Sequence, residues 1–314
     1  MKEKLKILFM GTPDFAVGIL KKIADQDHYL CGVVTAPDKQ AGRGRQKKES
    51  AVKKWATSQN LPVYQPTNLK SDAFNEQLKK LNPDVIIVVA FRMLPKKVWN
   101  FPPKGTINLH ASLLPDYRGA APIHWAIING ENKTGVTTFF IDEAIDTGKI
   151  IQYKETDIQE DDNVADLHDK LMNLGAELVT ETLDIIKNDD YLTSDQKLSA
   201  TDKKAPKLDK DSARINWHQP QQNLYNFIRG LSPFPCSWCY INDGKTTCKI
   251  YKAVKTDIPS TELPGTIIIM GKNIYVATND LNLQLNEFQI QNKKRMTAQD
   301  AINGNLIKSG DSLV

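Results

Sequence analysis

The sequence of 314 residues has no long hydrophobic run. Its longest apolar stretch, Val85–Phe91, contains seven residues, whereas a membrane-spanning helix needs about 20. Residues Met1–Lys6 lead into a short apolar segment with no small-residue cleavage site behind it, so we expect no secretory signal. These absences argue against a membrane or secreted protein, and they predict a cytoplasmic one.

Cysteine is also scarce, with four residues in the chain. Cys236 and Cys239 form a C-x-x-C pair, and Cys248 follows nine residues later, which could indicate a zinc site. No fourth ligand has a suitable spacing, however, and Pro235–Tyr240 is typical of a strand in which cysteine fills small, half-buried positions. We therefore predict that the chain binds no metal and that its compartment is reducing.

A net excess of charge is absent over most of the chain, since residues 1–209 hold 29 Lys and Arg and 29 Asp and Glu. The formal net charge is +4. Residues 210–314 hold 12 Lys and Arg against 8 Asp and Glu, so this last third carries the whole excess. Lys245, Lys249, Lys252, Lys255 and the Lys293–Arg295 cluster contribute to it. The bias fits a polyanionic partner, and a solvated surface explains it equally well.

Apolar segments alternate with amphipathic ones in the first part of the chain. Strands are predicted near residues 4–10, 31–35, 61–64 and 84–90, and helices near 15–23, 50–59, 71–81 and 164–186. This order predicts an α/β domain with a parallel sheet covered on both faces. The first turn, Gly11–Phe15, lacks the three-glycine spacing of a dinucleotide site, so we expect a Rossmann-like fold without a bound dinucleotide.

The periodicity changes in the second part. Residues 190–209 lose it and are predicted to be a linker between a first domain at 1–189 and a second at 210–314. Short strands near 237–241, 247–253, 265–270, 273–278 and 281–288, separated by turns rich in Asn, Asp and Gly, predict a small antiparallel OB-like β-barrel. Such barrels often bind nucleic acids, although this one could be only a structural appendage.

Reactive side chains concentrate between Thr106 and Gly148. Asn108 and His110 are two residues apart in a predicted strand end, so they should point to one face. Asp146 lies at the expected tip of a hairpin formed by residues 135–140 and 148–153, from which a carboxylate could reach the imidazole. An amide, an imidazole and a carboxylate serve acyl transfer, deamidation and structural hydrogen bonding alike, so these three residues alone leave the reaction open.

Four motifs in order narrow the choice: Gly11–Ala16, Asn108–Pro115, Tyr117–Pro122 and Asp146–Gly148. With them the chain resembles the 10-formyltetrahydrofolate-dependent formyltransferases, essentially from end to end. The resemblance implies that Asn108, His110 and Asp146 are catalytic and that the reduced folate is the formyl donor, a cosubstrate, with no metal involved.

The resemblance also implies where the folate binds. Ser112, Leu113, Leu114 and Pro115 match the folate-binding element, in which the leucines form apolar walls for a flat pterin. The facing wall is expected at Phe91, Arg92, Met93 and Leu94. Here the sequence Ala90–Pro95 is shorter and bulkier than the Ala-Tyr-Gly pattern of many relatives, so the resemblance does not say which of these residues contact the folate.

Within the superfamily the chain is most similar to the branch that formylates methionine on initiator tRNA in bacterial-type translation initiation. This rests on Gly11–Phe15, on the basic Gly-rich loop within Asp38–Glu49, and on the second domain. The resemblance places Arg43 on the key arginine of a loop that enters the tRNA acceptor end, and we expect Arg45, Lys47 and Lys48 to bind tRNA with it. The alternative is that the loop has no binding role, because basic Gly-rich loops are often only mobile and solvated. The branch also implies a monomer.

Two other interpretations stay open at this stage. A formyltransferase acting on a nucleotide-linked amino sugar would share the Asn108, His110 and Asp146 core, but it would need only one small anionic pocket rather than a basic loop and a basic second domain. A non-catalytic RNA-binding protein would not need the intact catalytic set.

Overall fold

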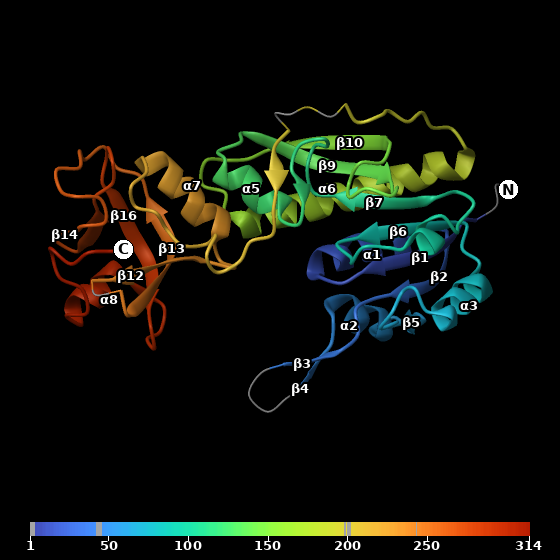
Figure 1. Ribbon diagram of the computed structural model, residues 1–314, viewed down its shortest axis with the longest axis horizontal. Helices are drawn as coiled ribbons and strands as arrows, with labels where there is room; N and C mark the ends of the chain where they lie inside the picture. Colours follow the sequence, from blue (N-terminus) through green and yellow to red (C-terminus); the bar gives the residue numbers. More distant parts are fainter. Residues whose placement is uncertain (1–3, 42–45, 198, 200–201, 243) are drawn as a thin grey trace. The chain divides into compact units, whose positions relative to one another are not determined.

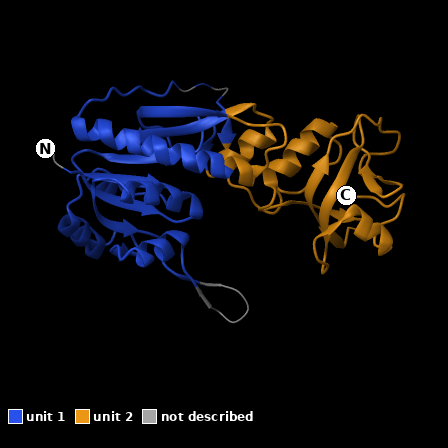
Figure 2. Cartoon of the chain, turned by 180° about the vertical axis from the view of Figure 1, so that it is seen from behind, with its two compact units in different colours: residues 1–119, 134–156, 168–204 blue, residues 120–133, 157–167, 205–314 orange. Residues whose placement is uncertain are grey.

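The computed structural model describes residues 4–41, 46–197, 199, 202–242 and 244–314. The chain divides into two compact units, drawn in separate colours in Figure 2. Unit 1 comprises residues 1–119, 134–156 and 168–204, and unit 2 comprises residues 120–133, 157–167 and 205–314. The chain therefore passes between the units several times. The predicted domains, 1–189 and 210–314, are continuous in sequence, whereas these units are each made of several segments. The predicted borders stay a prediction.

Unit 1 contains a seven-stranded sheet in the order β10-β9-β7-β6-β1-β2-β5 (Figure 1). Strands β1, β2, β5, β6 and β7 run parallel to one another, and β9 runs antiparallel to β7. The predicted Rossmann-like parallel sheet is confirmed. The strands are β1 (Lys6–Gly11), β2 (Tyr29–Val34), β5 (Val63–Tyr64), β6 (Val85–Val89), β7 (Thr106–His110), β9 (Lys133–Phe140) and β10 (Ile150–Asp157).

Helices cover both faces of this sheet. They are α1 (Asp14–Ala24), α2 (Ala51–Ser58), α3 (Asp72–Leu81), α4 (Lys96–Trp99) and α6 (Val164–Asn188), which begins in unit 2. Helices α3 and α4 pack on one face, where Phe74, Leu78 and Val98 join Leu8 and Ile86 in a buried core. On the other face α6 approaches β7 so closely that a methyl group on its Gly175 would lie 2.7 Å from Leu109.

Local chemistry explains where these elements begin. All five residues of β6 are buried, as expected of a central parallel strand of Val and Ile. Ser50 and Ser71 cap α2 and α3 by accepting hydrogen bonds from the amides of Lys53 and Phe74. None of the described helices is both long and apolar enough to cross a membrane.

Several short elements of unit 1 were not predicted from the sequence: the helix α4, the strand at Arg118–Gly119, and a hairpin in the basic segment. Within the basic segment, β3 (Lys39–Ala41) pairs antiparallel with β4 (Gln46–Lys48), so the two ends of the predicted loop form a hairpin (Figure 1).

Unit 2 is built on a six-stranded antiparallel sheet in the order β12-β13-β16-β15-β14, with β17 paired to β16. The antiparallel prediction is confirmed, and the OB-like label stays a prediction. The elements are α5 (Pro122–Ile128), α7 (Gln221–Leu231), β12 (Ser237–Ile241), β13 (Thr246–Val254), β14 (Ile267–Met270), β15 (Asn273–Val276), β16 (Leu283–Ile290), β17 (Met296–Thr297) and α8 (Ala298–Asn303). Two short strands, β8 (Arg118–Gly119) and β11 (Lys204–Ala205), pair with each other. Gly119 and Lys204 are each the last residue of a segment of unit 1.

All four cysteines are buried free thiols. Cys239 on β12 lies opposite Cys248 on β13, as expected of small core side chains in a strand pair. Within the described part of the chain, no three His, Cys, Asp or Glu side chains come together as metal ligands do. Burial raises the pKa of both Cys31 and Cys236 to about 11.

Buried thiols should make the protein less stable as the pH rises above 9. The unfolded thiol ionises near its ordinary pKa of 9.0 and the folded one only near 11, so between these values the unfolded state has released protons that the folded state still holds. Each such thiol lowers the free energy of unfolding by up to about 1.4 kcal/mol per pH unit. Urea unfolding at pH 8, 9 and 10 measures this slope, which we expect to be shallower in Cys31→Ala. An unchanged slope would contradict the assignment to this thiol.

Candidate active site

The site forms at the carboxyl end of β7. Asn108 and His110 alternate with Leu109, whose side chain contacts α6, so the two polar residues point to the opposite face of the sheet. Asn108 pairs with Val88 of β6 and with Phe139 of β9, which places it at a central position. Ala90, directly after β6, adopts a left-handed conformation with φ of 47°. The carboxyl edge of a parallel sheet is where such folds bind ligands.

His110 is almost fully buried, with 7% of its surface exposed. Its Nε2 lies 2.9 Å from the carbonyl oxygen of Tyr117. Because a carbonyl oxygen can only accept a hydrogen bond, Nε2 carries the hydrogen, and this fixes the tautomer of the neutral ring. The Nδ1 atom is therefore the nitrogen left for chemistry.

Asp146 faces that nitrogen. Its Oδ2 lies 3.9 Å from Nδ1 of His110, which is within ion-pair range and longer than a hydrogen bond. The same carboxylate oxygen accepts a hydrogen bond from the amide of Gly119 at 3.2 Å. Both side chains are largely buried, so the carboxylate acts on the ring through little intervening water. Protonation of His110 at Nδ1 would complete an ion pair with Asp146.

The side-chain amide of Asn108 remains available as a donor. Asn108 is half-buried, and among the described residues none hydrogen-bonds its side chain. The structure therefore gathers the three predicted catalytic residues into one geometry: Asn108 and His110 share one face of β7, and Asp146 faces the ring of His110. That arrangement supplies two hydrogen-bond donors and a carboxylate.

The predicted folate-binding element forms a tight turn after β7. Ser112 is fully buried. Its hydroxyl donates to the Asp116 carbonyl at 2.6 Å, and its own carbonyl accepts from the Thr137 hydroxyl at 2.7 Å. These bonds occupy Ser112 in holding the turn. Leu114 is buried, whereas Leu113 and Pro115 are partly exposed, so Leu113 and Pro115 are the members of this element that can offer a surface to a ligand.

The segment predicted to form the opposite wall of the folate site, Phe91–Leu94, also has both buried and exposed members. Leu94 is buried in the core beside α4, and Phe91 packs partly against that core. Arg92 donates to the backbone carbonyls of Pro66 and Thr67. Met93 is 71% exposed. Met93 and the partly exposed face of Phe91 are therefore accessible to a ligand, and the Arg92 guanidinium is engaged elsewhere.

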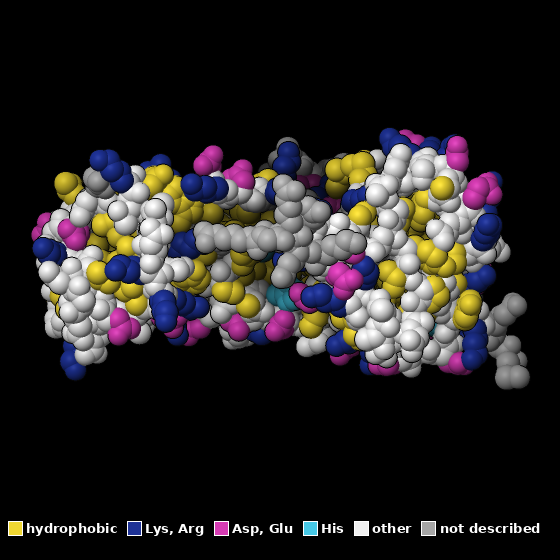
Figure 3. Space-filling view, turned by 90° about the horizontal axis from the view of Figure 1, so that it is seen from below, with side chains coloured by type: hydrophobic (Ala, Val, Ile, Leu, Met, Phe, Trp, Pro, Cys, Tyr) yellow, Lys and Arg dark blue, Asp and Glu magenta, His cyan; other side chains and the backbone are white. Residues whose placement is uncertain are grey.

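The predicted tRNA-binding residues are described only in part. Arg43, Arg45 and the side chain of Lys47 lie outside the described residues, and Lys48 is exposed at the end of β4. In unit 2, Lys255 pairs with Glu160 and Arg295 with Glu287, so two of the cations noted in the sequence have acidic partners. Figure 3 shows one face of the molecule, on which basic and acidic side chains are interspersed.

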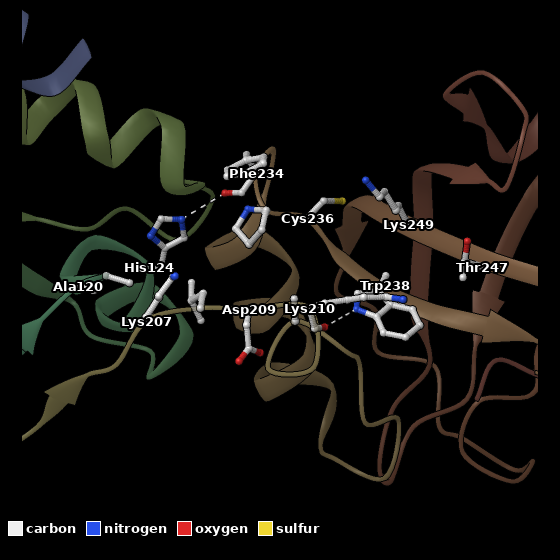
Figure 4. A pocket seen from close by; sticks show the side chains of 14 residues that line it. Ala120, His124, Lys207, Asp209, Lys210, Phe234, Cys236, Trp238, Thr247 and Lys249 are labelled. Atoms are coloured by element: carbon white, nitrogen blue, oxygen red, sulfur yellow. Dashed lines mark hydrogen bonds between the residues drawn. The ribbon is translucent and has the colours of Figure 1, made fainter. Parts of the chain in front are cut away.

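Unit 2 also contains a pocket of about 640 Å³. Three of its lining residues are cations, Lys207, Lys210 and Lys249, and two are the aromatic residues Phe234 and Trp238. The indole N–H of Trp238 donates to the Lys210 carbonyl at 2.6 Å, which fixes the ring, and the Phe234 side chain is largely exposed (Figure 4). Trp238 itself is 8% exposed and belongs to a buried cluster with Ala213 and Leu231, so Phe234 is the exposed one of these two aromatic residues. An exposed aromatic side chain near lysines is a feature of surfaces that bind nucleic acid.

Sequence reasoning missed two residues of the site. The Tyr117 carbonyl holds His110, and a backbone partner leaves no signature in the sequence. Arg118 donates from Nε to the backbone carbonyl of Asp146 at 2.8 Å. Its presence in the Tyr117–Pro122 motif was the available signal.

The chain belongs to the formyl transferase family. The family model described as "Formyl transferase" matches residues 4–183, and the one described as "Formyl transferase, C-terminal domain" matches residues 207–306. A solved structure with the same fold is that of WlaRD, a sugar 3N-formyltransferase studied in the presence of dTDP and 5-N-formyl-THF. It is 20% identical, covers 93% of this chain and 100% of its own, and has a TM-score of 0.66.

More similar relatives carry a more specific name. The methionyl-tRNA formyltransferase of Flavobacterium johnsoniae is 50% identical over 304 residues, which is 96% of each chain. That of Flavobacterium psychrophilum is 51% identical over 305 residues, again 96% of each chain.

Proposed function

We propose that the protein transfers the formyl group of 10-formyltetrahydrofolate to the free amino group of methionine on initiator methionyl-tRNA. The product, N-formylmethionyl-tRNA, is used to initiate translation. The observation that carries the reaction type is the grouping of Asn108, His110 and Asp146 at one strand end. The choice of acceptor is supported by the relatives named methionyl-tRNA formyltransferase, which match 96% of the chain. We further propose that the enzyme works as a cytoplasmic monomer.

The reaction needs stabilisation of negative charge. When the methionine amine attacks the formyl carbon, a new C–N bond forms and the formyl oxygen becomes an oxyanion. The side-chain amide of Asn108 and a protonated His110 donate hydrogen bonds to that oxygen. One such donor typically contributes about 3 kcal/mol of transition-state stabilisation. Because Nε2 of His110 is bound to Tyr117, Nδ1–H is the donor that the ring supplies.

The reaction also moves a proton. The attacking amine must lose one, and N10 of the folate must gain one as its bond to the formyl carbon breaks. Asp146 lies 3.9 Å from Nδ1 of His110, where it would pair with the imidazolium. It accepts the amine proton through a water, and the same water returns that proton to N10 as the bond from N10 to the formyl carbon breaks. No covalent enzyme intermediate is required.

The donor site that we propose lies beside this group. Leu113 and Pro115 would contact one side of the folate, and Phe91 with Met93 the other, because these are the accessible members of the two predicted walls. Ser112, Leu114 and Leu94 would support the walls from behind, and Arg92 would hold its own segment through the carbonyls of Pro66 and Thr67.

Two features support an RNA acceptor. The basic Asp38–Glu49 segment is carried on the β3–β4 hairpin. In unit 2, the pocket lined by the exposed Phe234 and three lysines offers one aromatic side chain and cations to a sugar-phosphate chain. We propose that tRNA contacts both, with Arg43, Arg45, Lys47 and Lys48 in the first.

A direct assay tests this function. The protein is incubated with 10-formyltetrahydrofolate and either methionyl-tRNA or amino-sugar nucleotides, and loss of the free amine is followed. We expect formylation of methionyl-tRNA alone. Formylation of the sugar nucleotide would replace the proposed acceptor, and no transfer to either would favour a non-catalytic RNA-binding protein.

Arg43→Ala should weaken formylation of methionyl-tRNA and leave folate binding intact, because the guanidinium is proposed to contact only the RNA. We expect about a 10- to 100-fold loss in kcat/KM for tRNA, equivalent to about 1–3 kcal/mol. Steady-state kinetics with varied tRNA and a separate folate titration measure both quantities. Lys22→Ala, on helix α1, is a control for general loss of positive charge. Unchanged tRNA turnover in Arg43→Ala would contradict this role.

A further inference from the structure

The turn that carries Asp146 has an unusual backbone. Asp146 is in the left-handed region, with φ of 55°. Residues other than glycine adopt this region at a cost of about 1–2 kcal/mol and keep it only when surrounding contacts impose it. The orientation of the carboxylate toward His110 depends on this backbone, so the contacts that impose it matter for the site.

Two side chains hold the Asp146 carbonyl. Arg118 donates to it from Nε at 2.8 Å, and Gln196 donates to it from Nε2 at 3.1 Å. The Gln196 amide also donates to the Gly148 carbonyl at 2.7 Å, so one side chain spans the turn. Because both carbonyls can only accept, the amide nitrogen of Gln196 faces the turn and its oxygen faces away.

That oxygen is also engaged. The Oε1 atom of Gln196 accepts a hydrogen bond from Nε of Arg118 at 3.0 Å and another from its Nη2. Nη1 of Arg118 lies 3.9 Å from Asp202, which balances its charge. Gln196 and Arg118 thus form a network with the backbone carbonyls of the turn and with the Asp202 carboxylate. A glutamine is suited to this place because it is donor and acceptor at once.

The backbone that bonds His110 is held by the same segment that contains Gln196. The amide of Tyr117 donates to the Lys203 carbonyl at 2.6 Å, and the amide of Lys203 donates to Asp116 at 3.1 Å. Tyr117 is itself left-handed, with φ of 60°, and its carbonyl fixes the tautomer of His110. Residues 184–206, which include Gln196 and Lys203, lie between the two family-model matches.

We infer that Gln196, with Arg118, is a positioning residue of the active site: it holds the backbone of Asp146 in the conformation that directs the carboxylate to His110. This inference rests on the proposed function, because it requires Asp146 to be catalytic. Gln196 does not touch the substrates. Its loss would lower kcat through Asp146 and leave the KM values for both substrates nearly unchanged.

The test uses the full-length protein with Gln196→Met, which keeps the size of the side chain and removes its hydrogen bonds. We expect kcat to fall about 10- to 100-fold, as for a small misplacement of a reacting group, with KM changed less than about threefold. The kcat of Gln196→Glu should fall at least as far. A carboxylate would still bind Arg118, but it cannot donate to the carbonyl oxygens of Asp146 and Gly148 and would repel them. Gln152→Met is the matched control, since the Gln152 side chain bonds Thr182 in the same unit and not the turn.

A double-mutant cycle separates positioning from simple damage. In an Asp146→Ala background, Gln196→Met should cost nothing further, because its effect acts through the missing carboxylate. Multiplied losses, or wild-type kcat in both Gln196 variants, would overturn the inference. If Asp146→Ala itself kept normal kcat, the assignment of Asp146 under the proposed function would fail instead, so the two failures are distinguishable.

Discussion

Replacing His110 or Asp146 with alanine is expected to lower kcat by about 10²- to 10⁴-fold while substrate affinity changes little. In the proposed mechanism, His110→Ala removes the Nδ1–H donor for the oxyanion, and Asp146→Ala removes the carboxylate that pairs with the imidazolium and accepts the amine proton. Interactions that form only in the transition state affect kcat rather than binding. Single-turnover formylation of methionyl-tRNA, with folate affinity measured separately, gives the two quantities.

A suitable control lies three residues from Asp146. Glu143 is an exposed acid that pairs with Lys96, so Glu143→Ala removes a carboxylate from the same connection between β9 and β10 without touching the site. It should turn over like the wild type. Near-normal single-turnover rates for both His110→Ala and Asp146→Ala would end the catalytic assignment.

Gly148→Ala should both destabilise unit 1 and abolish most of the activity. A methyl group on Gly148 would lie 1.7 Å from the carbonyl oxygen of Phe140, and since that atom belongs to the backbone, either β9 or the turn must move. Overpacking of this kind costs about 3 kcal/mol. The movement would also displace the Gly148 carbonyl and the adjacent Asp146. Urea unfolding and the formylation rate measure the two effects.

Gly304→Ala is the comparison for this substitution. In unit 2, at the end of α8, the nearest atom to an added methyl group is a carbonyl oxygen at 3.2 Å, so the neighbours need to give by only a few tenths of an ångström. We expect a small change in stability and none in catalysis. If Gly148→Ala had the unfolding midpoint and the rate of the wild type, the close packing of the turn against Phe140 would be refuted.

The main architecture could be predicted because it depends on strong local patterns. The apolar run of β6 and the amphipathic helices around it specify a covered parallel sheet. The two-residue spacing of Asn108 and His110 specifies a shared face, since side chains alternate along a strand. The antiparallel sheet of unit 2 follows from short strands separated by turn residues, although the limits of β14, β15 and β16 differ by two residues from the prediction at one end or both.

Other parts of the site could not be predicted, because they depend on contacts between distant backbone atoms. Nothing in the sequence shows that the Ser112 hydroxyl is used within its own turn, or that Arg92 reaches the carbonyls of Pro66 and Thr67. Gln196 lies in a polar segment without periodicity, which composition alone describes as a linker. Backbone carbonyls are present at every residue, so a side chain that binds them has no partner that the sequence reveals.

The contact between Gln196 and the Asp146 turn limits how the protein can be divided. A fragment cut at residue 189 would retain Asn108, His110 and Asp146 and lose the side chain that spans residues 146 and 148. A chimera that takes the C-terminal family region from another formyltransferase should therefore change sequence after Pro206, which keeps β11 and the segment with Gln196 together with the Asp146 turn. The segment before that point holds the turn of the proposed catalytic residue Asp146 and should be inherited with it.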